Sequence, residues 1–246
     1  MHSASSLPEG ANPLYGDAMT SRPVIAIDGN AASGKGALAR SLAKKLGFAH
    51  MDTGELYRLV ALRMLENGCA ATDEKSAVKF ARMIGRTFDH RHVTPSALKT
   101  DEISRMSSRI SGIAMVRAEV LEVQREFIKN PPDLPGGGVA MGTVLDGRDI
   151  GSVVCPDAPV KFFVTAEPET RAFRRFRELQ LCGFMGTYEA VLAEMFERDA
   201  RDAARTTAPM KPAPDAVILD TTTLSASEVV EAALSQAKEK LGVAGE

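Results

Sequence analysis

A short stretch near the amino terminus has the residue types and the spacing of a phosphate-binding loop. It matches the pattern G-x-x-x-x-G-K, in which glycines let successive backbone N–H groups and the start of the following helix point at phosphate oxygens. The lysine of the pattern adds a positive charge for the terminal phosphates. The residues of this stretch, with the two that follow the lysine, are Gly29, Asn30, Ala31, Ala32, Ser33, Gly34, Lys35, Gly36 and Ala37.

The segments on either side favour a phosphate loop over a plain glycine turn. Residues 23–28, PVIAID, form a largely apolar run that is too short for a helix and is typical of a strand buried on both faces. Leu38, Leu42 and Leu46 then recur at helical spacing, and Gly47 follows them. The sequence therefore predicts a strand, a phosphate loop and a helix over residues 23–47.

One expected chemical group is missing from the loop. The usual pattern has Ser or Thr after the lysine, where the hydroxyl binds Mg²⁺, but here Gly36 and Ala37 follow. Two interpretations are open. Either the chain is a nucleotide-binding module that has lost its catalysis, or it is a kinase in which water and the phosphates hold the metal.

A second group of charged residues, Asp146-Gly147-Arg148-Asp149, follows a predicted strand at residues 139–145. Ligands of open parallel sheets bind beyond the carboxyl ends of the strands. One carboxylate there could lie near Mg²⁺, the arginine could bind a phosphate and the second carboxylate could read a base. A surface turn is the alternative interpretation.

Arginines are dense from residue 168 to just beyond residue 204, where they recur at helical steps of three and four. Phosphoryl transfer to an acceptor that is itself anionic requires cations around the phosphates and a lid that excludes water. A solvated helix face with Glu–Arg pairs would show the same spacing. The residues concerned are Arg171, Arg174, Arg175, Arg177, Arg198, Arg201 and Arg205.

Further apolar runs at residues 160–165 and 216–219 alternate with helical stretches. This alternation predicts an α/β fold with a parallel sheet and helices on both faces. We expect a disordered extension at 1–21, a core at 22–68, an insert at 69–130, more core at 131–167, an arginine-rich lid at 168–211 and a final core strand and helix at 212–246.

Composition excludes several classes of protein. The 246 residues carry 30 Lys and Arg against 32 Asp and Glu, so long-range attraction to a nucleic-acid polymer is not expected. The three cysteines lie far apart, and the pair His90 and His92 lacks the further ligands that a metal site needs. With no apolar run long enough to span a bilayer and no signal peptide, we expect a cytoplasmic protein without a membrane partner.

Five segments together resemble the bacterial cytidylate kinases, which transfer a phosphate from ATP to CMP or dCMP. With their spacing they cover most of residues 23–235, and DGRDIG followed by PDAPVK is far more specific than the phosphate loop. The resemblance implies a P-loop NTPase fold with a CMP-binding insert and a helical lid. The segments are IAIDGNAASGKGALAR, MDTGELYRLVAL, SSRISGIAMVR, LDGRDIGSVVCPDAPVKFFVTA and ERDARDAARTTAPMKPAPDAVILDTT.

The resemblance also implies roles for individual residues. The loop at 29–37 would hold ATP, and Mg²⁺ would be held without a direct protein ligand, with Asp146 in contact through water. The residues facing cytosine would be Thr53, Arg117 and Asp149. Those binding the CMP phosphate would be Arg58, Arg148 and Arg205, and those contacting the sugar would be Ser108, Arg198 and Asp202. The lid over the ATP phosphates would carry Arg174 and Arg175. The catalytic set would be Lys35, Arg148, Arg174, Arg175 and Arg205.

Elementary chemistry agrees with the cytosine assignment. The carboxylate of Asp149 can accept a hydrogen bond from the amino group of cytosine, whereas uracil presents an acceptor oxygen at that position. Another small-acceptor P-loop kinase, for adenylate or shikimate, is the nearer alternative, and a weakened nucleotide-binding module is the more distant one. We expect ATP and Mg²⁺ as cofactors, CMP or dCMP as the acceptor, and a monomer.

Two departures from the family pattern are visible. Ala37 stands where the family commonly has a hydroxyl residue, which bears on the rate of the reaction. The first insert also lacks the Gly-Glu-Asp hairpin signature of longer members, which bears only on the size of the CMP-binding region.

Overall fold

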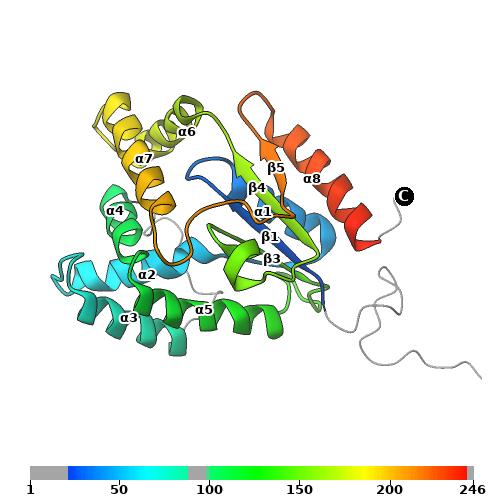
Figure 1. Ribbon diagram of the computed structural model, residues 1–246, viewed down its shortest axis with the longest axis horizontal. Helices are drawn as coiled ribbons and strands as arrows, with labels where there is room; N and C mark the ends of the chain where they lie inside the picture. Colours follow the sequence, from blue (N-terminus) through cyan, green and yellow to red (C-terminus); the bar gives the residue numbers. More distant parts are fainter. Residues whose placement is uncertain (1–21, 88–97, 99, 243–246) are drawn as a thin grey trace, which may run out of the picture.

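The centre of the protein is a sheet of five parallel strands in the order β2-β3-β1-β4-β5 (Figure 1). A computed structural model describes residues 22–87, 98 and 100–242. The predicted extension at 1–21 and the pair His90 and His92 lie outside the described residues. The strands are β1 (Val24–Gly29), β2 (Ala49–Asp52), β3 (Thr143–Gly147), β4 (Val160–Thr165) and β5 (Val217–Asp220).

The prediction of an α/β fold with a parallel sheet is confirmed, and most of the strand predictions hold. The strands at 23–28 and 160–165 lie within one residue of their predicted bounds. The strand predicted at 139–145 is wrong at its start, because Val139 is 60% exposed and pairing begins only at Thr143. The last strand begins one residue later than predicted. Strand β2 was missed, because its four residues AHMD give too short a pattern.

Helices cover both faces of the sheet. The helices α1 (Lys35–Leu46) and α8 (Ala226–Leu241) pack against Ile25 and Ile27 of β1. The helices α2 (Thr53–Glu66) and α5 (Ala114–Lys129) pack on the opposite face, where Val24 and Ala26 of the same strand point. Successive side chains of a strand point to opposite faces, so the apolar run in β1 supplies both cores.

Two groups of helices extend from this core. The first contains α3 (Glu74–Thr87), α4 (Asp101–Ile110) and α5; in Figure 1, α3 and α5 lie below the sheet and α4 lies to its left. The second contains α6 (Pro168–Leu181) and α7 (Tyr188–Ala203), at the upper left. Side-chain oxygens of Thr100 and Thr187 cap α4 and α7, as is favoured at a helix N-terminus. Residues at the carboxyl ends of β2 and β3 line hollows together with residues of α4 and α7.

A short π-helical turn, η1 (Ile150–Val154), follows β3 after Arg148 and Asp149 and contacts β1 and α5. Among the described residues, no helix is both long enough and apolar enough to cross a membrane. The three cysteines are not joined in disulfides.

Candidate active site

The phosphate loop connects β1 to α1, as the sequence predicts. Gly29 has φ +150°, and a Cβ atom on it would lie 2.0 Å from the carbonyl oxygen of Val164 in β4. Only glycine fits there. On its other side the loop is held by Thr221, whose hydroxyl donates to the carbonyl oxygen of Ser33 at 2.9 Å. The loop conformation is therefore set by the neighbouring strands before any ligand arrives.

The first turn of α1 offers its backbone N–H groups to an anion. Gly34 occupies the N-cap position with φ +92° and has no side chain with which to cap the helix. The first N–H groups of a helix have no partners within it, and together with the helix dipole they attract phosphate oxygens. Lys35 is the next residue, so its ammonium group extends from the same turn.

Lys35 is buried among charges of both signs, with Arg148 and Arg198 on one side of the balance and Asp146 and Asp52 on the other. Burial, with the added repulsion of Arg148, lowers the pKa of Lys35 to about 8, although Asp146 and Asp52 act in the opposite direction. The pKa of Arg198 is likewise lowered to about 10, by burial and then by Arg148. A cation whose pKa is lowered in this way gains when an anion binds beside it. The cluster is thus prepared for phosphate groups.

Asp146 is the penultimate residue of strand β3 and lies opposite Asp52 of β2, beside the start of α1. It is 1% exposed, and its Oδ1 lies 2.8 Å from Nε2 of His50. Its other carboxylate oxygen, Oδ2, points to the loop, 3.6 Å from the position that a Cβ atom on Gly36 would take. The structure therefore places one predicted carboxylate against the phosphate loop.

The three residues predicted to face cytosine are brought together at the ends of β3, α2 and α5. Arg117 and Asp149 form a buried ion pair. Thr53 donates to the backbone carbonyl of Asp146 at 2.8 Å, so its hydroxyl lies at the same strand end. The guanidinium of Arg117 lies 5.9 Å from the ring centre of Tyr57, at cation–π distance.

The residues predicted to bind the acceptor phosphate are held by carboxylates. Arg58 donates to Asp52 at 2.7 Å. Arg148 and Arg205 donate to the two carboxylate oxygens of Asp202, Arg148 at 3.1 Å. Burial acts to raise the pKa of Asp202, but the arginines Arg148, Arg205 and Arg198 hold it below its usual value. Asp202 therefore stays charged and orients two arginines at once.

Two predicted sugar contacts carry buried polar atoms that find no partner among the described residues. They are Oγ of Ser108 on α4 and Nε of Arg198 on α7. Both side chains line one hollow at the carboxyl edge of the sheet, together with Lys35 and Arg117. A buried polar atom without a partner is costly, and a bound ligand that supplies the missing hydrogen bond would remove that cost.

This hollow, of about 140 Å³, is lined by fourteen further residues besides those four. It adjoins a second hollow of about 230 Å³ toward α6 and α7, and the two share Lys35, Asp52, Arg58, Arg148 and Arg198. We call the two together the central cleft. It extends from the phosphate loop to the ion pair of Arg117 with Asp149.

The structure separates the two predicted lid arginines, which are neighbours in the sequence. Arg174 donates to the hydroxyl and the carbonyl oxygen of Thr221, at 2.9 and 2.7 Å, so it lies beside the phosphate loop. Arg175 donates to Ser104 of α4 at 2.9 Å and lines the central cleft. Arg174 and Ala37 together line a separate hollow of about 480 Å³ between α1 and α8.

Other arginines of this segment have structural partners. Arg171 is buried, donates to the carbonyl oxygen of Ala166 at 2.8 Å and pairs with Asp199. Arg201 pairs with Glu197 one turn earlier on the same helix, as in the solvated-face interpretation. The arginine pattern thus combines cleft residues with ordinary helix partners.

Several residues of the site escaped the sequence analysis. Asp28 is 3% exposed and accepts hydrogen bonds from the N–H groups of Ile150 and Gly151, at 2.7 and 2.8 Å. It therefore fixes the turn that follows Asp149, and burial raises its pKa to about 6. The signal was a carboxylate at the end of an apolar strand. His50 was also missed, because its partner Asp146 lies 96 residues away.

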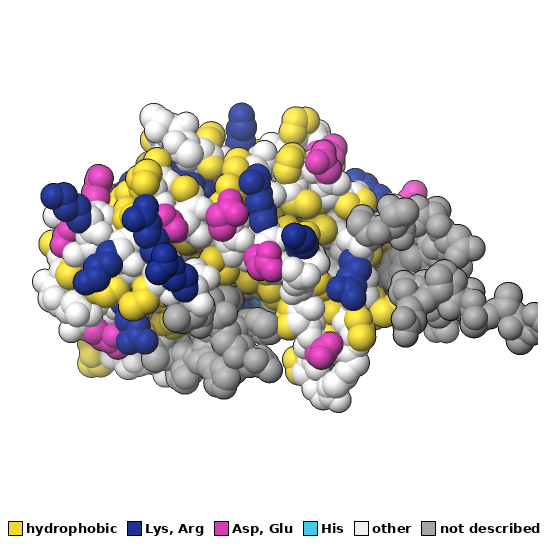
Figure 2. All heavy atoms as spheres, turned by 90° about the horizontal axis from the view of Figure 1, so that it is seen from below, with side chains coloured by type: hydrophobic (Ala, Val, Ile, Leu, Met, Phe, Trp, Pro, Cys, Tyr) yellow, Lys and Arg dark blue, Asp and Glu magenta, His cyan; other side chains and the backbone are white. Residues whose placement is uncertain are grey.

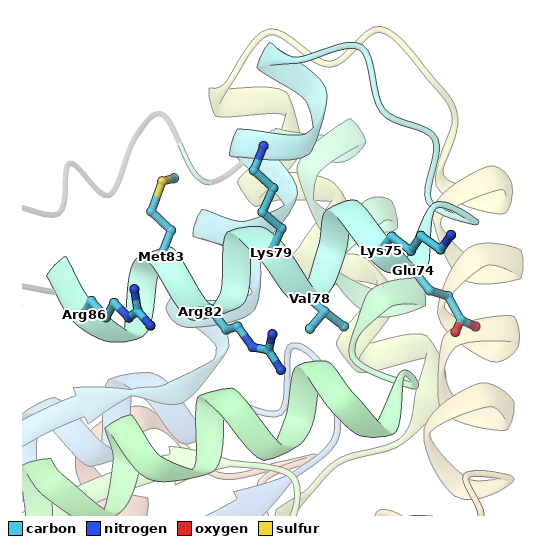
Figure 3. A pocket seen from close by; sticks show the side chains of 7 residues that line it. All are labelled: Glu74, Lys75, Val78, Lys79, Arg82, Met83 and Arg86. Carbon is cyan, nitrogen blue, oxygen red and sulfur yellow. The ribbon is translucent and has the colours of Figure 1, made fainter.

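The surface below the two groups of helices has a mixed charge. Figure 2 shows Lys and Arg side chains interspersed with Asp and Glu on the face seen from below. A further hollow beside α3 is lined by seven side chains of that one helix (Figure 3). Lys79 and Met83 point to one side of α3 and Arg82 to the other, where it pairs with Glu119 of α5 at 2.7 Å.

The family model described as cytidylate kinase matches residues 25–239. A cytidylate kinase from Rhodospirillum rubrum is 47% identical over 211 residues, which cover 86% of this chain and 95% of the relative. A cytidylate kinase from Azorhizobium caulinodans is 47% identical over 212 residues, with 86% and 96% covered. A solved gluconokinase from Sinorhizobium meliloti 1021 aligns over 90% of this chain and 96% of its own, at 15% identity and a TM-score of 0.42, which is too distant a likeness to support a conclusion.

Proposed function

The chain belongs to the cytidylate kinase family, and we propose that it transfers the terminal phosphate of ATP to CMP and dCMP, with the diphosphates as products. The observation that carries this proposal is the pair of buried atoms without partners, Oγ of Ser108 and Nε of Arg198, in the cleft between the phosphate loop and the Arg117–Asp149 pair. A nucleotide seated there would supply partners to both atoms.

The base would be chosen by the ion pair. Asp149 accepts from Arg117 through one carboxylate oxygen, and the other oxygen can accept from the amino group of cytosine. Uracil would bring a carbonyl oxygen against this carboxylate. Two hydrogen-bond acceptors held close together in a buried site repel each other, which weakens binding, so the site would reject UMP.

The acceptor phosphate would be held by Arg58, Arg148 and Arg205. Each now donates to a carboxylate of the cleft, so each is already oriented. A CMP phosphate is itself an anionic nucleophile, and no general base has to remove a proton from it. Positioning of the two phosphates and neutralisation of their charge would therefore provide most of the rate enhancement.

The phosphate loop would hold the triphosphate of ATP. Backbone N–H groups at the start of α1 and the ammonium group of Lys35 would bind its oxygens. Arg174 would approach the phosphates from the side of the loop and Arg175 from the side of the cleft. The helices α6 and α7 would shield the phosphates from water.

Mg²⁺ fits this site as an ion held mainly by phosphates and water. Among the described residues, no group of three or more His, Cys, Asp or Glu side chains is arranged to bind a metal. Asp146, with Oδ2 directed to Gly36, would contact the hydrated ion, in line with the preference of Mg²⁺ for water and carboxylate oxygen. When bound, the ion would neutralise charge on the β- and γ-phosphates.

The regions predicted from the sequence take roles in this proposal. Residues 69–130 would form the CMP-binding insert, 168–211 the lid, and 22–68, 131–167 and 212–246 the core. We further propose that the protein works as a monomer in the cytoplasm.

A panel of acceptors tests the proposal. ADP release from Mg²⁺-ATP is measured with CMP, dCMP, UMP, AMP and GMP, and with no acceptor. We expect CMP and dCMP to support turnover far better than the other three. A preference for AMP or UMP would contradict the assignment, as would binding of ATP without turnover of any acceptor.

A further inference from the structure

We propose that Ser111, at the C-terminal end of α4, is a positioning residue that orients Arg205 and Arg117 for the acceptor nucleotide. This inference rests on the proposed function and adds a residue to the same site. The sequence analysis assigns no role to Ser111. It is hydrogen-bonded to three residues that are predicted to contact the nucleotide.

The contacts of Ser111 come from different parts of the fold. Its hydroxyl oxygen accepts from Nη2 of Arg205, just beyond α7, at 2.7 Å. Its backbone carbonyl accepts from Nη1 of Arg117, on α5, at 3.2 Å. Its hydroxyl proton goes to the carbonyl oxygen of Ser108 at 2.9 Å. One residue thus joins the predicted phosphate, base and sugar contacts.

The direction of each hydrogen bond is settled by chemistry. A guanidinium group can only donate, so the hydroxyl of Ser111 is the acceptor toward Arg205. The hydroxyl proton is engaged by Ser108, which fixes the rotation of the hydroxyl and directs its lone pairs at the arginine. Ser111 is 7% exposed, so water does not readily replace it in this role.

A neutral acceptor is suited to this position. Asp202 also binds Arg205, but a carboxylate competes with an incoming phosphate for the positive charge. The hydroxyl of Ser111 holds the guanidinium in place without neutralising it. Arg205 can therefore keep its orientation while its charge is used on the phosphate.

Ser107 offers a matched control on the same helix. It is also a buried serine, at 5% exposed, and its hydroxyl also donates to a carbonyl oxygen three residues earlier, that of Ser104, at 3.0 Å. The two serines differ in that the hydroxyl of Ser111 also accepts from an arginine. Ser107→Ala therefore removes the same local hydrogen bond without the link to Arg205.

The test compares Ser111→Ala with Ser107→Ala by CMP binding at equilibrium without ATP, by steady-state kinetics and by melting temperature. Alanine keeps the backbone carbonyl that binds Arg117 and removes only the hydroxyl. We expect Ser111→Ala to weaken CMP binding and raise the KM for CMP about tenfold, with the KM for ATP unchanged, which is the usual effect of losing one hydrogen bond from a charged donor. Ser111→Thr, which keeps the hydroxyl, should restore binding to within about twofold.

A double-mutant cycle separates positioning from general stability. In an Arg205→Ala background, Ser111→Ala should change CMP affinity less than about twofold, because the effect acts through Arg205. An undiminished effect in that background, or equal effects of Ser111→Ala and Ser107→Ala, would overturn the proposal. If Ser111→Ala does not fold, Ser111→Cys, with its weaker acceptor, takes its place in the cycle.

The outcome for Ser111 is distinguishable from the outcome for the proposed function. Turnover of CMP by the wild-type protein is measured first, and its absence contradicts the proposed activity. Even in that case, the comparison of equilibrium CMP binding between the wild type and Ser111→Ala still tests the role of Ser111. Normal turnover and normal binding in Ser111→Ala would contradict the inference alone.

Discussion

The phosphate loop and the central cleft solve the same problem, holding phosphate, in different ways. The loop is nine consecutive residues whose backbone N–H groups and glycines make the site. The cleft is assembled from side chains of β3, α2, α4, α5 and α7, and carboxylates orient three of its arginines, Arg58, Arg148 and Arg117. A backbone cradle suits any triphosphate, whereas a set of paired side chains can distinguish one acceptor from another.

The two regions meet at Lys35 and Arg148, and the strongest test removes either one. Lys35→Ala and Arg148→Ala should each lower turnover about a thousandfold, because each cation stabilises charge that develops during transfer. The melting temperature should change little. For Lys35 the reason is that burial lowers its pKa, so we do not expect its charge to stabilise the folded state.

Activity per folded molecule and thermal melts check this expectation. A variant that unfolds early yet keeps its activity while folded would have a structural role instead. For Arg148→Ala, Asp202 keeps Arg205 as a partner, so no carboxylate is left buried alone.

Arg174 and Arg175 are neighbours in the sequence, but Arg174 lies beside the phosphate loop and Arg175 lines the central cleft. Each alanine variant should lower phosphoryl transfer about a hundredfold and raise hydrolysis of ATP by water, since the phosphates would be less shielded. Arg174→Ala should also raise the KM for ATP, because that side chain lies beside the loop. ADP release without an acceptor measures the hydrolysis, and unchanged hydrolysis in both variants would contradict a lid.

Specificity should depend on the cleft alone. Asp149→Asn replaces a carboxylate oxygen by an amide donor or acceptor, and we expect the preference for CMP over UMP to fall about thirtyfold. The KM for ATP should stay as in the wild type, because the side chain of Asp149 is paired with Arg117, a residue predicted to face the acceptor base. The ratio of kcat/KM for the two acceptors is the measurement, and an unchanged ratio would exclude Asp149 as the reader of the base.

The lowered pKa of Lys35 predicts how ATP affinity depends on pH. Above about pH 8 the free protein loses the charge of Lys35, so ATP should bind more weakly as pH rises from 7 to 9. The contribution of Lys35 to folding stability changes in the opposite direction and rises with pH. The reason is that its pKa in the folded state lies below the unfolded value of 10.5. The cost of the buried charge is therefore present below pH 8 and fades as pH rises.

Lys35→Arg provides the control, since a guanidinium stays charged over this range. Equilibrium binding of ATP to both proteins should give a steeper loss for the wild type above pH 8. Parallel profiles would show that Lys35 does not titrate there.

The loop also carries the smallest expected effect. One hydrogen bond to a charged group changes a rate about ten- to a hundredfold at most, and the loop N–H groups with Lys35 remain. Ala37→Thr should therefore leave CMP turnover unchanged or raise it modestly, most visibly at low Mg²⁺. Restoration of turnover from a level near zero would instead favour a weakened nucleotide-binding module.

The same contrast explains what the sequence could predict. A strand, glycine loop and helix within 25 residues leave a local pattern, and the structure has them at residues 24–46. The short strand β2 left none. Within the cleft, Asp28 and the N–H of Ile150 are 122 residues apart, and Ser111 and Arg205 are 94 apart. Residues so far apart in the sequence meet only in the folded chain, and no local pattern reveals them. Only the family resemblance pointed to other residues of the same site.

The most direct test of the account places two acceptors in one reaction. Equal amounts of CMP and UMP compete for limiting ATP with Mg²⁺, and the two diphosphates are separated and quantified. Because the loop treats both alike, any preference reports the cleft. The account predicts that CDP far exceeds UDP with the wild-type protein and that the excess shrinks with Asp149→Asn. Equal amounts of CDP and UDP from the wild type, or an excess of UDP, would contradict it.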